Sequence, residues 1–393
     1  MQNFNFYRPT DFYFGKDQEN NVGDICVKHA IKRVLVHFGG GSVKKSGLLD
    51  KVLASLEKAG IYFELLGGVK PNPRDDLVYE GIDQCRAHKL ELVLAVGGGS
   101  VIDSAKAIAM GVPYEGDFWD FFMGGKVPKE ALPVGTIVTI AAAGSEGSNS
   151  CVINKVVDGV VKKKGSNFQT SVPLFSILDP QLTCTVPPFE TACGAADIMC
   201  HVLERYFTNT HNVQLTDELC EGILRTMVTM FPRVMRNPHD YETRAAIMWA
   251  GTLAHNNLCG VDREQDWASH RIEMELSALY DVAHGAGLTV LFPAWMEYVL
   301  EHNVMRFARF AVKVFGCQMD YENPQTTAKA GIEALRRLWG DAGLPLNFEE
   351  LGAKACDIPT LVKNHGDNPE GHFVVLHKDD IEKIFTIASN YQH

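Results

Sequence analysis

The N-terminal half of the chain alternates short apolar runs with amphipathic segments, which is the pattern of an α/β fold. Two of the runs lead through a GGGS tetrapeptide into helical periodicity, at residues 44–60 and 101–111. Apolar runs of strand length lie at residues 33–38, 61–66, 90–96, 132–140 and 174–178. Because these runs are apolar throughout instead of alternating with polar residues, we expect a parallel sheet that helices cover on both faces.

Two further segments carry β signals of another kind. Aromatic residues recur through residues 3–15 and the segment ends at Gly15. This pattern predicts a strand, either in a hairpin or at a sheet edge where a second copy of the chain could pair. The segment at 156–165, centred on Gly159, predicts a hairpin or a loop.

The pattern changes after Pro187 and Pro188. From Thr191 onward the apolar residues follow helical periodicity almost throughout, with few β-branched runs. We therefore expect an α/β domain over residues 1–182 and an all-helical domain over residues 183–393.

Composition narrows the class of protein. The 393 residues suffice for two or three domains, and 46% hydrophobic with 22% charged residues is ordinary for a globular protein. A net charge of −11 without a long basic run argues against nucleic-acid or anionic-membrane partners. No apolar stretch of about 18 residues predicts a membrane span, and the start lacks a secretory signal. The ten cysteines form no C-x-x-C pair, which favours reduced thiols and a cytoplasmic location.

The two GGGS loops are candidate phosphate sites. Each follows a predicted strand and precedes a predicted helix, the first with Gly40, Gly41 and Ser42 and the second with Gly98, Gly99 and Ser100. Glycine lets the backbone approach a ligand, and a helix N-terminus offers free N–H groups and partial positive charge. Neither loop has the P-loop or G-x-G-x-x-G pattern. Two such loops in one domain favour a dinucleotide.

The first loop also bears on the choice of dinucleotide. In a Rossmann-like domain the loop after the first strand meets the adenosine ribose, where an acidic residue holds the 2′-hydroxyl and repels a 2′-phosphate. Here the loop carries Ser42, Lys44 and Lys45 and no acidic residue. We therefore expect NADP(H) to be favoured over NAD(H).

A candidate metal site lies in the helical half. Asp197 and His201 are four residues apart on a predicted helix, so both side chains lie on one face. His270 and His284 follow downstream, and a chain reversal at residues 280–282 is needed to bring these two together. One aspartate and three histidines suit Fe²⁺ or Zn²⁺ and leave room for a substrate oxygen, as in a Lewis-acid centre. The other histidines, His255 among them, are expected to be structural or on the surface.

The chain resembles the iron-containing (group III) alcohol dehydrogenase family, most of all its butanol dehydrogenase and NADPH-dependent aldehyde reductase branch. The resemblance runs through most of the chain and thins after about residue 295. It rests on specific segments: FGGGSVKKSG, VKPNP, LAVGGGSVIDSAKA, AAAGSEG, ILDP, GAADIMCHVLERY, QDWASH and ELSALYDVAHGAGL.

The resemblance implies a dinucleotide-binding domain similar to that of dehydroquinate synthase, an all-helical domain, and an active site in the cleft between them. It places the family's metal ligands on Asp197, His201, His270 and His284. Its cofactor contacts fall on the two glycine loops and, beyond them, on Asp103, Thr139, Ser145 and Lys163.

Two positions depart from the family pattern. Many members carry a histidine, proposed for proton relay, where this chain has Met274, so a relay through that side chain is not available. The nicotinamide loop commonly has threonine where this chain has Ala143, which removes one hydroxyl contact.

The expected function is a metal-dependent alcohol dehydrogenase or aldehyde reductase acting on short- to medium-chain substrates, in a cytoplasmic homodimer. Trp119, Phe121, Phe122, Trp249 and Trp267 could line an apolar pocket, although core packing is the expectation for each of them singly. Alternatives are a polyol (glycerol) dehydrogenase, a dehydroquinate synthase-like lyase, and a nucleotide-binding protein without catalysis.

Overall fold

The computed structural model describes residues 3–392, which form two compact units. One unit comprises Tyr7–Val186, and the other comprises residues 187–392 together with residues 3–6. Residues 1, 2 and 393, which the expected domain bounds include, lie outside the described residues.

The first unit is built on a six-stranded sheet in the order β1-β8-β5-β4-β2-β3, and every described strand pair in it is parallel. The predicted parallel sheet is confirmed. Its central strands are buried along their whole length, as their continuous apolar sequences require. The strands are β1 (Asp11–Phe14), β2 (Arg33–Gly39), β3 (Tyr62–Val69), β4 (Leu92–Gly97), β5 (Val134–Val138) and β8 (Phe175–Leu178).

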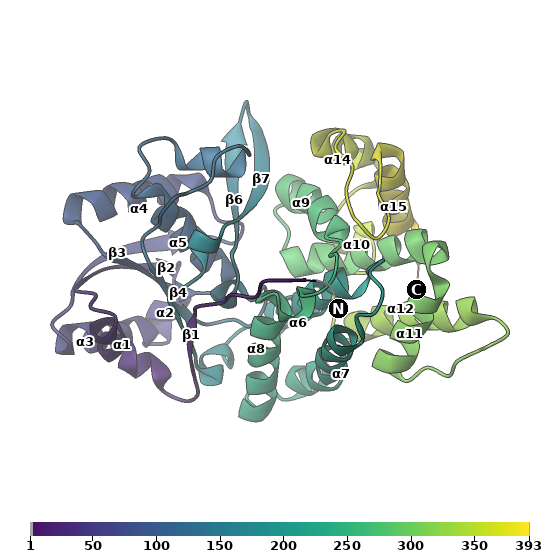
Figure 1. Ribbon diagram of the computed structural model, residues 1–393, viewed down its shortest axis with the longest axis horizontal. Helices are drawn as coiled ribbons and strands as arrows, with labels where there is room; N and C mark the ends of the chain where they lie inside the picture. Colours follow the sequence, from purple (N-terminus) through teal and green to yellow (C-terminus); the bar gives the residue numbers. More distant parts are fainter. Residues whose placement is uncertain (1–2, 393) are drawn as a thin grey trace. The chain divides into compact units, whose positions relative to one another are not determined.

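Helices cover both faces of this sheet (Figure 1). One face carries α1 (Val22–Lys28), α2 (Ser42–Lys45) and α3 (Leu48–Lys58), whose apolar residues form one core with β2, β4, β5 and β8. The other face carries α4 (Asp75–His88) and α5 (Gly99–Gly111). The single helix expected over residues 44–60 is a wrong prediction: Gly47 takes φ +74°, a left-handed conformation that separates α2 from α3.

The N-terminal strand is shorter than the sequence predicts, because only Asp11–Phe14 pairs, in parallel with β8. Residues 3–10 form no regular element, and Phe4, Phe6 and Tyr7 among them are exposed. The predicted hairpin is present: β6 (Ser150–Val157) and β7 (Val160–Asn167) are antiparallel and turn at Asp158 and Gly159, both with positive φ (Figure 1).

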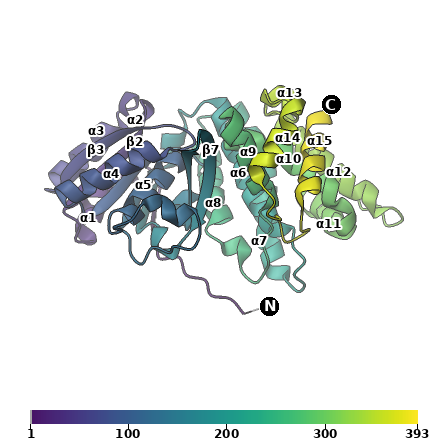
Figure 2. The ribbon, with the colours of Figure 1, turned by 90° about the horizontal axis from the view of Figure 1, so that it is seen from above.

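The second unit is helical apart from a β-bridge between Glu370 and Leu376 in its described part. Figure 2 shows α6, α9 and α10 side by side in it, and α10 packs against both α6 and α9. None of the described helices combines the length and apolar character that crossing a membrane requires. The main helices are α6 (Pro188–Tyr206), α7 (Gln214–Arg236), α8 (Tyr241–His255), α9 (Ala268–Tyr280), α10 (His284–Val299), α11 (Val304–Phe315), α12 (Pro324–Gly340), α13 (Phe348–Leu351), α14 (Ile358–His365) and α15 (Lys378–Asn390).

Candidate metal centre and nucleotide-binding loops

Helix α6 presents the first two candidate ligands from one buried face. Pro188 begins the helix, where its missing N–H costs nothing. Asp197 and His201 lie one turn apart, and both are almost fully buried. His201 Nδ1 is 2.8 Å from the carbonyl oxygen of Asp197 and 3.0 Å from its Oδ1. With the proton on Nδ1, the Nε2 of His201 is the nitrogen that can bind a metal.

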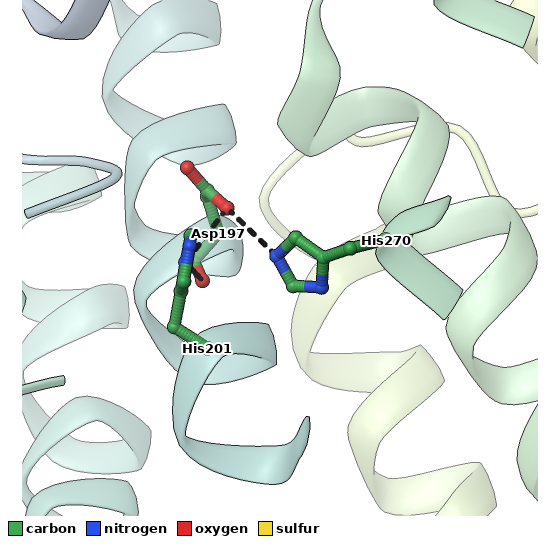
Figure 3. Close-up of side chains that lie close together, drawn as sticks. All are labelled: Asp197, His201 and His270. Carbon is green, nitrogen blue, oxygen red and sulfur yellow. Dashed lines mark hydrogen bonds and ion pairs between the residues drawn. The ribbon is translucent and has the colours of Figure 1, made fainter. Parts of the chain in front are cut away.

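Helix α9 supplies the third ligand, His270, two residues after the helix begins. Its Nε2 faces Asp197 Oδ1 at 3.7 Å (Figure 3). Its Nδ1 lies 2.7 Å from Glu204 Oε1. Ligand atoms of Asp197, His201 and His270 all lie within 4.8 Å of one another. The structure therefore brings His270 next to two side chains that precede it in the sequence by 69 and 73 residues.

The three side chains fit a divalent cation. Asp197 Oδ1 and His270 Nε2 are buried, and neither atom makes a hydrogen bond of good geometry within the described residues. Asp197 Oδ1 lies beside the other two candidate ligands, with His201 Nδ1 at 3.0 Å and His270 Nε2 at 3.7 Å. Buried polar atoms without partners are costly, so such a pair normally marks a place that a ligand satisfies. One carboxylate oxygen and two imidazole nitrogens are ligands that Fe²⁺ and Zn²⁺ both accept.

His284 lies beside these three residues without joining their group. Helix α9 ends at Tyr280, Asp281 takes φ 52°, and α10 begins at His284, so the expected chain reversal is present. The ring centroid of His284 is 5.3 Å from that of His270. Gly285 lets α10 approach α6 closely, because a Cβ there would lie 2.2 Å from the carbonyl oxygen of Cys193. The Nδ1 of His284 is hydrogen-bonded to Glu273.

The electrostatics of the group favour an ionised Asp197. Burial opposes its charge, but His201 and His270 outweigh burial and hold the pKa of the carboxyl well below its usual value. Burial lowers the pKa of His201. Burial also acts against a charged His270, but Asp197 and Glu204 outweigh it and raise the pKa of that imidazole to about 9. Because a ligating imidazole must be neutral, a metal would displace the proton from His270 when it binds.

Sequence reasoning missed the residues that surround these ligands. Glu204 and Glu273 are fully buried, and each bonds a candidate ligand histidine. Glu204 follows Asp197 by seven residues and Glu273 follows His270 by three, so helical spacing would have been the signal. His255, expected to be structural or on the surface, is nearly buried with its ring centroid 4.2 Å from that of His201.

The two glycine loops stand at the carboxyl ends of neighbouring parallel strands, β2 and β4, where an open α/β sheet binds ligands. Gly40 and Gly41 are exposed, and Ser42 begins α2. In the second loop Gly99 and Ser100 begin α5, after Gly98. A Cβ at Gly98 would lie 2.3 Å from Ile140 Cγ2, whereas a Cβ at Gly40 would meet nothing within 4 Å. Packing therefore requires glycine at 98 but leaves residue 40 open to solvent or a ligand.

The remaining predicted cofactor residues are engaged within the α/β unit. Ser145 donates its hydroxyl to Asp103 (2.7 Å), and the ammonium of Lys106 lies 2.7–3.0 Å from four oxygens of residues 145–150. Thr139 follows β5 and donates its N–H to the carbonyl of Gly97 (3.1 Å). Lys163, on β7, donates to Asn72 Oδ1 (3.2 Å).

The aromatic residues considered for an apolar pocket divide into three groups. Trp119, Phe121 and Phe122 are buried, and Trp119 stacks on Phe122 with ring centroids 5.4 Å apart, as core residues do. Trp249 is 38% exposed. Trp267 lies among the candidate ligands, with its ring centroid 5.2 Å from that of His270.

The chain is similar to known proteins over almost its whole length. Residues 9–180 match the family model of iron-containing alcohol dehydrogenases, and residues 191–389 match the C-terminal model of the same family. The chain is 40% identical to the probable NADH-dependent butanol dehydrogenase 2 of Bacillus subtilis, over 98% of this chain and 99% of that protein. It is 34% identical to the NADPH-dependent aldehyde reductase YqhD of Escherichia coli, over 99% of this chain and 100% of that protein.

A solved structure extends the likeness to three dimensions. The crystal structure of NADH-dependent butanol dehydrogenase A from Thermotoga maritima superposes with a TM-score of 0.95 at 39% identity, covering 99% of both chains. Both family models and the full-length relatives thus cover the α/β unit and the helical unit alike. The chain belongs to the iron-containing alcohol dehydrogenase family, in the branch of butanol dehydrogenases and aldehyde reductases.

Proposed function

We propose that this alcohol dehydrogenase interconverts short- to medium-chain aldehydes and primary alcohols, with one divalent metal, Fe²⁺ or Zn²⁺, held by Asp197, His201, His270 and His284. The observation that carries the proposal is the facing pair of buried atoms, Asp197 Oδ1 and His270 Nε2, which lie 3.7 Å apart and make no hydrogen bond of good geometry within the described residues. The names of the relatives, butanol dehydrogenases and an aldehyde reductase, supply the substrate class.

Hydride transfer requires the protein to position the reactants and to stabilise charge, and it requires no nucleophilic side chain. A cation bound at this centre supplies a Lewis acid for a carbonyl oxygen, which is worth several kcal/mol. The low pKa of Asp197 keeps its carboxylate ionised and ready to bind that cation. Burial of Asp197, His201 and His270 limits the access of water to these ligands and strengthens the electrostatic contacts between them. Hydride from the nicotinamide needs no covalent intermediate, so neither a serine nor a cysteine nucleophile is required.

The test of this proposal is metal-dependent reduction of butyraldehyde. Initial rates of NADPH and NADH oxidation are measured on chelator-stripped protein and again after adding Fe²⁺ or Zn²⁺. We expect activity to vanish on stripping and to return with metal. Absence of activity with every metal would contradict the proposal. A parallel series with glycerol separates this function from that of a polyol dehydrogenase.

For the cofactor, the proposal extends to a preference for NADP(H). Lys44 and Lys45 lie on α2 just after the exposed Gly40 and Gly41, and both lysines are exposed themselves. Such cations suit a 2′-phosphate, and acidic residues are absent from residues 39–47. The relatives include both NADH-dependent and NADPH-dependent enzymes, so their names do not decide the matter. A kcat/KM for NADPH below that for NADH would reverse this assignment.

We propose that the dinucleotide is contacted by the two glycine loops, through Gly40, Gly41, Ser42, Gly98, Gly99 and Ser100. We propose that Asp103, Thr139, Ser145 and Lys163 lie nearer the nicotinamide.

We also propose a cytoplasmic homodimer that pairs through β1. This strand lies at one edge of the sheet, where strands of two copies can join. Sedimentation showing a monomer at micromolar concentration would contradict the dimer. The cytoplasmic location is supported by the ten cysteines, all of which are free thiols, and cell fractionation tests it.

A further inference from the structure

A buried carboxylate stands behind His270. The side chain of Glu204 is fully buried on α6, and its Oε1 accepts from His270 Nδ1 (2.7 Å) and from the backbone N–H of His270 (3.0 Å). Its Oε2 accepts from the backbone N–H of Trp267 (2.7 Å). Trp267 takes φ 70°, a costly conformation for a tryptophan, at the position just before α9 begins. Glu204 thus fixes both the imidazole of His270 and the start of the helix that carries it.

A second buried carboxylate stands behind His284. Glu273 is fully buried on α9, where its Oε2 bonds His284 Nδ1 and its Oε1 accepts from the hydroxyl of Ser277. The carboxylate packs directly on the first turn of α10, because a Cβ at Gly287 would lie 2.3 Å from Glu273 Oε1. Close packing at Gly287 and the hydrogen bond from Ser277 therefore help to hold this carboxylate against the ring of His284.

We infer that Glu204 and Glu273 are positioning residues of the metal centre. Each carboxylate holds the proton of its histidine on Nδ1, which leaves Nε2 as the nitrogen that binds metal. Each also adds negative charge behind a neutral ligand, which makes that imidazole a stronger donor. The inference rests on the proposed metal site, and it assigns to the two glutamates a share of the metal affinity although neither is a ligand.

Glu273 offers the cleaner substitution. In Glu273→Gln the amide oxygen can accept from His284 Nδ1 and the amide nitrogen can donate to Ser277 Oγ, so the shape and both hydrogen bonds persist while the charge is lost. Glu204 is less suitable, because its two oxygens accept from three N–H groups and an amide would set a donor against at least one of them.

A matched control lies on the same helix. Glu275 is two residues further along α9, and its carboxylate faces His365 at 3.9 Å instead of a candidate ligand. Glu275→Gln removes the same charge from the same helix. Glu273→Asp supplies a second variant, because it keeps the charge but withdraws the carboxylate from His284 by one methylene.

The experiment measures the Zn²⁺ dissociation constant of the full-length metal-free proteins by competition with a chromophoric chelator. Circular dichroism verifies the fold, and the visible absorption of the Co²⁺-loaded proteins reports the ligand geometry. We expect E273Q to bind Zn²⁺ about 10- to 100-fold more weakly than wild type, E273D to fall between them, and E275Q to match wild type.

The outcomes separate this inference from the proposed function. E273Q binding Zn²⁺ as tightly as wild type, with an unchanged Co²⁺ spectrum, would overturn the role of Glu273. If E273Q fails to fold, E273D decides, and an affinity equal to that of wild type overturns the role in the same way. A wild-type protein that binds neither Zn²⁺ nor Co²⁺ would overturn the metal site itself, and the inference with it.

Discussion

The two units of this enzyme prepare their sites in opposite ways. In the helical unit the candidate ligands are charged or titratable side chains. Asp197, His201 and His270 are buried, and the carboxylates of Glu204 and Glu273 orient His270 and His284. In the α/β unit the candidate phosphate loops are glycine backbone at the ends of β2 and β4, and the predicted contacts at Gly40 and Gly41 are exposed.

The contrast follows from what each ligand demands. A small cation needs a few donors at fixed short distances, which buried side chains held by a second layer of hydrogen bonds provide. A dinucleotide is long and carries phosphates, which backbone N–H groups at helix N-termini bind with little side-chain chemistry. Substitutions at the metal centre should therefore act mainly by changing the charge of the site. Substitutions in the glycine loops should act mainly by adding side-chain atoms that collide with the protein or the cofactor.

Asp197→Asn tests the charge side of this contrast with the largest expected effect. The amide keeps the shape of the carboxylate but removes the only anionic ligand of the centre, so the metal loses its strongest donor. We expect metal content to fall sharply and kcat/KM for aldehyde reduction to fall by about 10³-fold or more, the several kcal/mol that a Lewis acid contributes. Elemental analysis and initial rates provide the measurement. E275Q serves as the charge-matched control, and an Asp197→Asn enzyme that keeps both metal and activity would break the comparison.

Lys106→Met asks whether the α/β unit also depends on a buried charge. The side chain of Lys106 is fully buried, and its ammonium donates hydrogen bonds to four oxygens of residues 145–150. Methionine fills the space but leaves those oxygens without donors, so we expect a loss of about 3 kcal/mol in the free energy of unfolding. Urea unfolding measures it against Lys164→Met, which removes an exposed lysine. Equal stability of the two variants would show that the ammonium is dispensable.

The sequence predicts what local periodicity controls. The spacing of Asp197 and His201 places both on one face of a helix, and the apolar runs before the GGGS loops are strands of one parallel sheet. It does not predict contacts between segments distant in the chain. The Glu204–His270 bond joins residues 66 apart, and Lys106 reaches oxygens 39 to 44 residues away. Tertiary packing alone decides such pairings.

Two local predictions are wrong because a periodic pattern in the sequence extends further than the element it forms. The periodicity of residues 44–60 continues through Gly47, yet the left-handed conformation of that glycine ends α2 and starts α3 anew. The aromatic pattern of residues 3–15 continues beyond the four residues that pair with β8, because a strand forms only where a neighbour accepts its hydrogen bonds.

His37 is the counterpart in the α/β unit of the buried histidines of the metal centre, and it predicts a pH dependence. Its Nδ1 donates to the carbonyl of Leu66 (2.9 Å) and its Nε2 accepts from the hydroxyl of Ser104 (2.8 Å). Burial lowers its pKa to about 4, whereas an unfolded histidine titrates near 6.5. Between about pH 6.5 and pH 4, His37 is therefore protonated in the unfolded chain but neutral in the native state. Stability is present above about pH 6.5 and is lost as the pH falls toward 4.

The size of this effect is measurable by urea unfolding at pH 8 and pH 5. Linkage predicts that His37 accounts for about 2 kcal/mol of the loss between these two values. In His37→Gln the amide can make both hydrogen bonds but cannot titrate, so the loss should be smaller by that amount. An unchanged loss in the variant would show that other groups govern the acid sensitivity of the α/β unit.

Gly98→Ala and Gly40→Ala test whether each glycine is required by packing within the protein or by close approach of the cofactor. Of all the variants, Gly40→Ala has the smallest expected effect. A Cβ at Gly98 collides with Ile140, so that variant should lower stability and cofactor affinity together. A Cβ at Gly40 meets nothing within 4 Å in the protein, so stability should hold. Any loss of affinity must then come from the nucleotide, whose close approach glycine permits.

We expect Gly40→Ala to weaken NADPH binding by about 3- to 10-fold, roughly 1 kcal/mol, with an unchanged urea midpoint. Fluorescence titration of NADPH measures the binding. If Gly40→Ala binds NADPH as tightly as wild type, the first loop does not contact the cofactor closely and the second loop alone carries the phosphate site. If it destabilises the fold instead, the glycine serves the protein, and the division between a site built from side chains and a site built from backbone no longer describes this enzyme.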